Sequence, residues 1–165
     1  MENDYFAEIV KKEHKTVFHV ALGYVKNIHD ADDIVQNVFL KLLNKSSDFA
    51  NEEARKAWLI RVTINESKDL LKSTWFRKRT ELDESVAMPQ NDDFGIYDYV
   101  KALKPKYRTI IYLYYYQQYS TEEISKILKI PKSTVTTQLH RARARLKESI
   151  IKEDSYYGEQ LQGNI

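Results

Sequence analysis

Apolar residues at helical spacing are the feature that most limits what this chain can fold into. Ile34, Val38 and Leu42 recur at intervals of four residues, and similar runs recur outside residues 73–99, as along the buried face of an α-helix. No segment alternates apolar and polar residues in the manner of a half-buried strand. The run "IIYLYYY" at 110–116 has β propensity, but its flanking residues favour a helix. The sequence therefore predicts an all-α fold.

Three helices are expected in the N-terminal part of the chain. The first covers about residues 4–26, the second begins near residue 30, and the third covers about residues 53–73. Aspartates stand at 30, 32 and 33 in the first turn of the second helix, where negative charge interacts favourably with the helix dipole. The apolar faces of these helices predict a small helical domain.

A short helix, a turn and a longer basic helix follow one another from residue 120. In "STEEISKILKIPKST", Ser120 and Glu123 have the spacing of a capping box. The apolar pattern stops at Lys129 and Ile130, and Pro131 is well placed to begin the next helix. This order predicts a helix-turn-helix, whose second helix enters the major groove of DNA. Since the turn contains no glycine, Lys129 or a neighbour must adopt an unusual backbone conformation.

The second of these helices separates an apolar stripe from a polar face. The stripe consists of Val135, Leu139, Ala142 and Leu146. At about 100° per residue, Thr137, His140 and Arg141 lie opposite this stripe. Arg143 and Arg145 lie on its two flanks. This layout suits a helix in a groove bordered by phosphates; the alternative is the ordinary solvated face of an amphipathic helix.

Charge is distributed unevenly in a chain whose formal net charge is only +2. Residues 100–150 hold 11 Lys and Arg against 3 Asp and Glu, whereas residues 1–72 hold 11 against 12. Residues 73–99 hold 3 against 6 and contain proline and glycine, which is the composition of a linker. We expect a helical domain, a flexible acidic linker, a second helical domain with the helix-turn-helix, and a frayed tail, at 1–76, 77–97, 98–152 and 153–165.

The sequence contains no motif typical of a disulfide-bonded, membrane-spanning, metal-binding or phosphate-binding protein. Cysteine is absent, so no disulfide forms, and without a basic-apolar signal segment a cytoplasmic location is expected. The most apolar run, at 110–116, is far shorter than the ~20 residues of a membrane span, so no direct membrane insertion is expected. The histidines have no metal-ligand spacing with a carboxylate, and no phosphate-binding glycine loop is found. We expect no catalytic residue, metal or cofactor.

Four ordered blocks resemble the two conserved regions of bacterial RNA polymerase sigma factors. They are "DADDIVQNVFLKLL", "AWLIRVTINESKDLLKS", "KPKYRTIIYLYYYQQYSTEEISKIL" and "STVTTQLHRARARL". The resemblance is to the short extracytoplasmic-function (ECF) group and covers about residues 5–150. It implies a promoter-recognition subunit whose first domain binds the polymerase clamp and opens DNA at the minus-ten element. The second domain would bind the minus-thirty-five element.

The resemblance assigns roles to residues of the first domain. Asp33, Gln36 and Asn37 match positions that dock on the coiled coil of the polymerase clamp. Asn65 matches the position that reads a base flipped out of the minus-ten element. The residues expected at this element are Arg61, Asn65, Lys68 and Lys72. Without the resemblance, each is equally an ordinary solvated side chain. Trp58 is interpreted as a core residue rather than as a wall for the flipped base.

The second helix of the helix-turn-helix carries two expected groups of DNA contacts. Those expected at base edges are Thr136, Thr137, His140 and Arg141. Those expected at phosphates are Lys132, Arg143 and Arg145. Thr136 lies at the margin of the polar face and matches a base-reading position of the family. Arg141 is the foremost candidate for reading a base, because an arginine can pair bidentately with guanine.

The partners that the resemblance implies are RNA polymerase core, promoter DNA and a cognate anti-sigma factor, often membrane-anchored. The alternative function is a stand-alone helix-turn-helix regulator. That alternative leaves the block "AWLIRVTIN" unexplained, and the dimer symmetry usual for such regulators has no counterpart in the sequence. The block "TWFRKR" at 74–79 interleaves aromatic and basic residues, which suits either DNA contact or a basic helix end.

Overall fold

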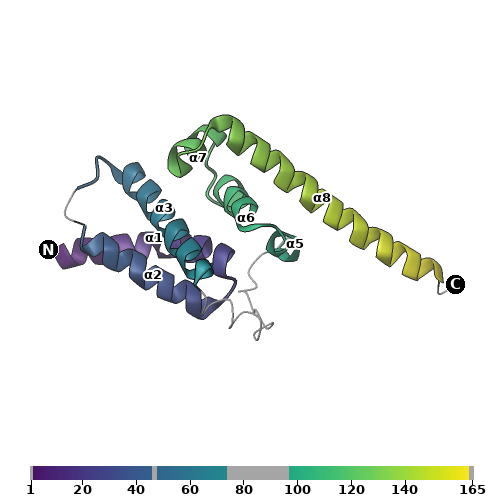
Figure 1. The fold of residues 1–165 in the computed structure, drawn as a ribbon, viewed down its shortest axis with the longest axis horizontal. Coiled ribbons are helices and arrows are strands. Elements are labelled where there is room, and N and C mark those ends of the chain that lie inside the picture. The colour runs from purple at the N-terminus through teal and green to yellow at the C-terminus, as the bar shows by residue number, and fades with distance from the viewer. Residues whose placement is uncertain (1, 46–47, 74–96, 164–165) are drawn as a thin grey trace. The chain divides into compact units, whose positions relative to one another are not determined.

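The computed structural model describes residues 2–45, 48–73 and 97–163 (Figure 1). Within these ranges every regular element is a helix and no strand occurs, which confirms the all-α prediction. The helices form two compact units, one in the N-terminal and one in the C-terminal part of the chain. Each unit has its own buried apolar residues, as expected for two small helical domains.

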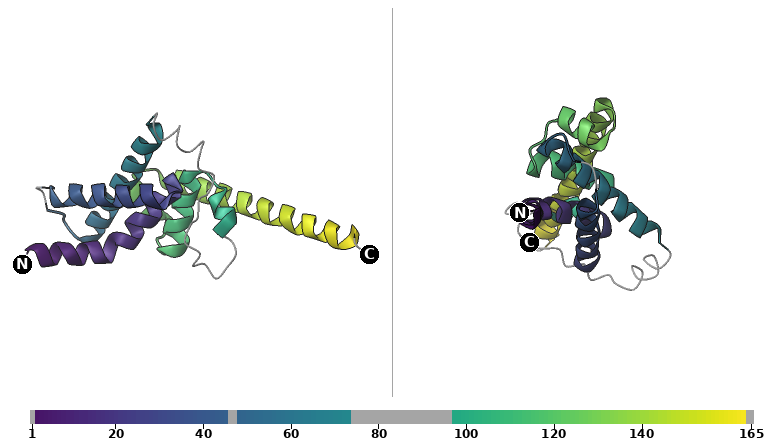
Figure 2. Two further views of the ribbon diagram at one scale, coloured as in Figure 1. Left: turned by 90° about the horizontal axis from the view of Figure 1, so that it is seen from below. Right: turned by 90° about the vertical axis from the view of Figure 1, so that its left-hand side faces the viewer.

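The first unit is a bundle of α1 (Glu2–Val25), α2 (Ile28–Leu43) and α3 (Glu52–Lys72). Each of these helices packs against the other two, as both views in Figure 2 show. The most deeply buried apolar side chains of the bundle include Val17, Ala21, Val38, Leu59 and Ile60. They come from all three helices, and their removal from water is the main stabilising term for a bundle of this kind.

Asparagines begin two helices of this bundle. The side-chain oxygen of Asn27 accepts a hydrogen bond from the backbone N–H of Asp30 at 3.2 Å. Asn51 accepts one in the same way from Ala54 at 2.8 Å. Each cap satisfies a backbone donor that the first helical turn leaves without an intrahelical partner. Because Asn27 is the cap, α2 begins at Ile28, two residues before the expected start.

A buried carboxylate lies between charged side chains of α1 and α3. Glu13 is only 4% exposed, and its Oε1 has no hydrogen-bond partner among the residues that the structure describes. Burial raises the pKa of Glu13, with the positive charges of Lys56 and Arg55 opposing the shift. Nearby, Lys12 and Glu52 form an ion pair that lowers the pKa of the Glu52 carboxylate through its hydrogen bond. The opposite pKa shifts of these two carboxylates predict that the stability of the α1–α3 packing depends on pH.

The second unit contains α5 (Tyr97–Lys101), α6 (Pro105–Ile111), the π-helical segment η1 (Tyr112–Tyr116), the first residues of α7 (Thr121–Leu128), and α8 (Lys132–Gly163). Its centre is the packing of α6 on α8, with α5 also against α8. The buried apolar side chains include Tyr107, Ile110, Leu113, Val135, Leu139 and Ala142. The tyrosine-rich run is helical, as predicted, but its last part has the wider π-helical turn.

The helix-turn-helix is present with its expected start and turn. The Ser120 N–H donates to Glu123 Oε2 at 2.7 Å, and the Glu123 N–H donates to Ser120 Oγ at 3.1 Å, which is a complete capping box. Lys129 has a positive φ of 55°, as predicted for a turn without glycine. Pro131 provides the backbone carbonyl that accepts from Val135 N at 3.2 Å in the first turn of α8.

The residues after Lys152, which were predicted to form a frayed tail, belong to α8. α8 continues as one helix to Gly163. An i, i+4 ion pair between Lys152 and Glu148 at 3.1 Å supports the extension. The Tyr99 hydroxyl also hydrogen-bonds to Glu153. The predicted linker at 77–97 lies outside the described residues except for Tyr97, which begins α5.

Candidate nucleic-acid and polymerase interfaces

The polar side of α2 is a continuous exposed surface. Asp33, Gln36 and Asn37 are exposed, whereas Ile34 and Val38 between them are buried. The exposed side continues one to two turns further with Leu40 and Leu43, which are 55% and 57% exposed. The sequence interpretation did not include these two leucines. Helical periodicity could have predicted their exposure, since both lie away from the buried side that Ile34, Val38 and Leu42 define.

One side of α3 gathers the residues expected at the minus-ten element. Asn65, Lys68 and Lys72 are exposed, and Arg61 lies one turn before Asn65 on the same side. The opposite side carries Thr63 and Ser67, which are fully buried. Their hydroxyls donate to the backbone carbonyls four residues earlier, at 2.6 and 2.7 Å, so neither buried polar group lacks a partner. The arrangement leaves the Asn65 amide and the Lys68 and Lys72 ammonium groups exposed along a single line, whereas Arg61 is half-buried and donates to the Ile127 carbonyl at 2.9 Å.

An aromatic pair lies at the start of α3. The ring of Trp58 is 5.5 Å from that of Phe49, and Lys45 Nζ lies 5.4 Å from the Trp58 ring centroid and 5.2 Å from that of Phe49. The sequence suggested that Trp58 is a core residue. In the structure its side chain is only half-buried. Lys45 and Phe49 were not anticipated, because no local pattern links them to Trp58. The block 74–79, with Trp75 and Phe76, lies outside the described residues.

α8 presents the polar face that the helical spacing predicts. All four residues expected at base edges are exposed: Thr136, Thr137, His140 and Arg141. The facing stripe of Val135, Leu139 and Ala142 is at most 3% exposed. The stripe anchors α8 in its unit, so the opposite face is held toward solvent. This is the geometry of a helix that can enter a groove of DNA.

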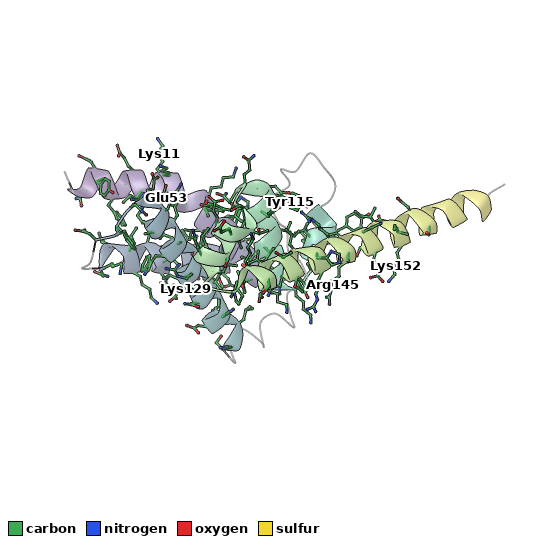
Figure 3. The ribbon with its side chains drawn as sticks, turned by 90° about the horizontal axis from the view of Figure 1, so that it is seen from above. Lys11, Glu53, Tyr115, Lys129, Arg145 and Lys152 are labelled. Carbon is green, nitrogen blue, oxygen red and sulfur yellow. The ribbon has the colours of Figure 1, made fainter. Side chains whose placement is uncertain are left out.

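The expected phosphate contacts are also exposed on α8. Lys132 lies in its first turn, and Arg143 and Arg145 lie further along. Figure 3 shows Arg145 on this helix and Tyr115 on the segment that precedes α7. The guanidinium of Arg145 lies 5.0 Å from the Tyr107 ring centroid, which is within the range of a cation–π interaction.

Arg143 is held by tyrosines that the sequence interpretation did not connect with it. Its Nε donates to the Tyr115 hydroxyl at 2.6 Å. The guanidinium carbon lies 5.2 Å from the Tyr114 ring centroid and 5.5 Å from that of Tyr115. The hydrogen bond with Tyr115 is the main cause that raises the pKa of Arg143. The guanidinium is therefore a permanent positive charge on an aromatic surface.

Two further properties of the described residues bear on function. None of their helices is long and apolar enough to cross a membrane. Among the same residues, no group of three or more histidine, aspartate or glutamate side chains could hold a metal ion.

The two units and their exposed faces define a helical protein with a DNA-reading helix-turn-helix. Comparison with protein families adds two matches: residues 9–77 match Sigma-70 region 2, and residues 94–146 match Sigma-70, region 4. The first match contains the α2 and α3 surfaces, and the second contains the helix-turn-helix. The order of the two regions is the order predicted from the four sequence blocks.

Relatives match over most of their length. RNA polymerase sigma factor SigV of Bacillus subtilis (strain 168) is 31% identical over 150 residues, covering 86% of this chain and 89% of the relative. The RNA polymerase sigma-E factor of Streptomyces coelicolor is 30% identical over 160 residues, covering 90% and 88%. The ECF RNA polymerase sigma factor SigW of Bacillus subtilis is 27% identical, covering 90% of each chain. The chain belongs to the RNA polymerase sigma factors, in their ECF group, and acts in transcription initiation.

Solved structures share the fold. The sigma factor RpoE in complex with the anti-sigma factor NepR, from Bartonella quintana, has a TM-score of 0.67 at 24% identity, covering 87% of this chain and 94% of that one. CnrH in complex with the cytosolic domain of CnrY also has a TM-score of 0.67, at 23% identity, covering 91% and 90%. These similarities support the all-helical architecture of two small domains.

Proposed function

We propose that this sigma factor directs RNA polymerase core to its promoters by reading the minus-thirty-five element with α8 and opening DNA at the minus-ten element with α3. The observation that carries the proposal is the two-sided character of α8. Thr137, His140 and Arg141 are exposed on the side opposite the buried residues Val135 and Leu139. A rigid helix that is anchored in this way can present the same side chains to successive base pairs.

The contacts on α8 divide by chemistry. Arg141 offers two parallel N–H donors to the O6 and N7 atoms of guanine, whereas Thr136, Thr137 and His140 offer single donors or acceptors to base edges. Lys132, Arg143 and Arg145 neutralise phosphates, which contributes affinity but no sequence information. Specificity in the minus-thirty-five element therefore depends on the first group, and salt-dependent affinity depends on the second.

The first unit supplies the other two interfaces. Asp33, Gln36 and Asn37 form the polar part of the surface that docks on the polymerase clamp. Asn65 reads a base flipped from the minus-ten element, since its amide can donate and accept at a Watson–Crick edge. Arg61, Lys68 and Lys72 follow the backbone of the separated strand through electrostatic attraction. The alignment of these four α3 residues on one side supports a single strand path.

The chain is proposed to be a non-catalytic, cytoplasmic subunit. The polymerase performs nucleotidyl transfer, and this chain supplies promoter recognition and strand opening through binding energy alone. The proposed domains are residues 1–76 and 98–152, joined by the linker at 77–97. The structures of RpoE and CnrH were each solved with an anti-sigma protein or its domain, which supports a cognate anti-sigma factor as a further partner of this chain.

A co-purification experiment tests the proposal. The tagged chain is expressed in its native cell and purified, and the eluate is examined for polymerase subunits. Core subunits are expected in the eluate, and DNA retained by the complex should be enriched in promoter fragments. A chain that enriches promoter DNA without any core subunit would instead be a stand-alone regulator. An additional small protein in the eluate would be the candidate anti-sigma factor.

The role of α3 has a separate test. Asn65→Ala should reduce open-complex formation on a native promoter, but it should have little effect on a premelted template in which the recognised base is replaced. Lys11→Ala, an exposed change on α1, is the matched control and should leave both reactions unchanged. An equal loss on both templates would contradict the base-reading role of Asn65.

A further inference from the structure

The tyrosine-rich segment η1 is a rigid surface beside α8. The Gln117 N–H donates to the Tyr112 carbonyl, five residues earlier, at 3.1 Å, which is the hydrogen bond of a π-helical turn. The Gln117 side-chain amide donates to the Tyr112 hydroxyl at 2.9 Å, and Gln118 then takes a positive φ of 58°. Such turns are rare and occur frequently at functional sites. The backbone that carries Tyr114 and Tyr115 is therefore held at both ends of the turn.

Arg143 is restrained by this surface although it lies in the exposed part of α8. Its Nε–H donates to the Tyr115 hydroxyl, and its guanidinium carbon lies near two aromatic rings. A free arginine side chain has many rotamers, and fixing it on a phosphate costs conformational entropy. Tyr115 removes part of this cost before DNA arrives, because the side chain is already ordered.

The remaining donors suit a phosphate. A guanidinium presents five N–H donors in a planar fork, and the Nη donors can pair bidentately with two oxygens of one phosphate. Tyr115 is itself 50% exposed, so the Arg143–Tyr115 pair lies at the surface where a DNA backbone can approach.

We propose that Tyr115 is a positioning residue for DNA binding, which orders Arg143 for a phosphate contact. The inference rests on the proposed function, since it assumes that Arg143 meets DNA. It extends the interface from α8 to η1 and explains why a surface arginine is bonded to a tyrosine 28 positions away in sequence. Tyr115→Phe keeps the aromatic ring and removes only the hydroxyl.

The test is a double-mutant cycle on the full chain with a labelled duplex of mixed sequence, measured across a range of salt concentrations. Arg143→Ala should weaken binding and lower the salt slope by about one unit. Tyr115→Phe should weaken binding about three- to tenfold, because Arg143 must then be ordered when DNA binds. In the Arg143→Ala background, Tyr115→Phe should have no further effect. Tyr116→Phe, on the same turn, is the matched control and should bind as the unaltered chain does.

The outcomes separate the inference from the function on which it rests. If Arg143→Ala weakens binding but Tyr115→Phe behaves like Tyr116→Phe, the positioning role is overturned and the phosphate contact stands. An equal loss from Tyr115→Phe in both backgrounds would mean that Tyr115 acts without Arg143, which also overturns it. If Arg143→Ala binds normally, the proposed phosphate contact and the inference both fail. Melting curves of the variants exclude a general loss of folding.

Discussion

Ser125 and Ile130 are hydrogen-bonded to each other in both directions across the turn of the helix-turn-helix. The Ile130 N–H donates to the Ser125 carbonyl at 3.2 Å, and the Ser125 hydroxyl donates to the Ile130 carbonyl at 2.6 Å. Between them, Lys129 takes the left-handed conformation with a φ of 55°. This is the backbone pattern of a Schellman motif, in which glycine usually occupies the left-handed position. The turn between α7 and α8 thus has a defined geometry without glycine.

Replacing Lys129 with glycine should stabilise the turn of the helix-turn-helix. A side chain beyond Cα is unfavourable at positive φ, so Lys129→Gly should raise the free energy of unfolding by about 0.5–1 kcal/mol. Lys126→Gly, in the interior of α7, is the matched control and should lower it by about 1 kcal/mol. Thermal unfolding followed by circular dichroism measures both. A loss of stability in Lys129→Gly would mean that the lysine side chain has a structural role in the turn.

Neutralising Glu13 should stabilise the first unit at neutral pH. The folded-state pKa of Glu13 is raised by burial, so its protonated form favours folding below the unfolded pKa, and this contribution is lost as pH rises through the folded pKa. Glu13→Gln should therefore have a higher Tm than the unaltered chain at pH 7, and the difference should vanish below about pH 4.

Glu52→Gln is the control, because its change in Tm at neutral pH should have the opposite sign. The pKa of Glu52 is lowered by its hydrogen bond with Lys12, so its contribution is present above the unfolded pKa and is lost on acidification. At neutral pH, the Tm of Glu52→Gln should be lower than that of the unaltered chain, and the Tm of Glu13→Gln should be higher. Thermal unfolding at a series of pH values measures both. A shift of the same sign in both would contradict the assigned effect of burial on Glu13.

The exposed side of α2 should contribute to polymerase binding and little to folding. Asp33→Ala combined with Gln36→Ala should weaken the affinity for core polymerase while leaving Tm nearly unchanged, because both side chains are exposed. Ile34→Ala, on the buried side, should instead lower stability by about 2–5 kcal/mol. Affinity is measured by titration of labelled core. Normal core affinity in the double variant would remove this surface from the proposed interface.

Arg141→Ala and Lys132→Ala should weaken DNA binding in different ways. Arg141→Ala should cost about 1–3 kcal/mol on the cognate minus-thirty-five element and less on an element altered at its guanine. Lys132→Ala should weaken all duplexes alike and lower the salt slope by about one unit. Salt titrations on cognate and scrambled duplexes distinguish the two. If the effect of Arg141→Ala did not depend on sequence, its place at a base edge would be wrong.

The sequence by itself determined the features that depend on neighbours along the chain. The capping box of Ser120 and Glu123 and the unusual backbone at Lys129 involve residues within a few positions of each other, so their spacing was sufficient. The exposed and buried sides of α2 and α8 followed from periodicity, because a helix converts spacing directly into direction. Four ordered blocks were then enough to indicate the family.

Only the tertiary structure decided which distant residues meet. Arg143 and Tyr115 are brought together by the packing of neighbouring helices in the second unit, and burial of Glu13 depends on how α3 covers α1. The π-helical turn and the continuation of α8 to Gly163 were also not predicted from local sequence. The tyrosine run indicated only a helix, and the two glycines near the end of the chain indicated a frayed tail. Such contacts depend on how many side chains from different helices pack together. The spacing of residues along one helix does not predict that packing.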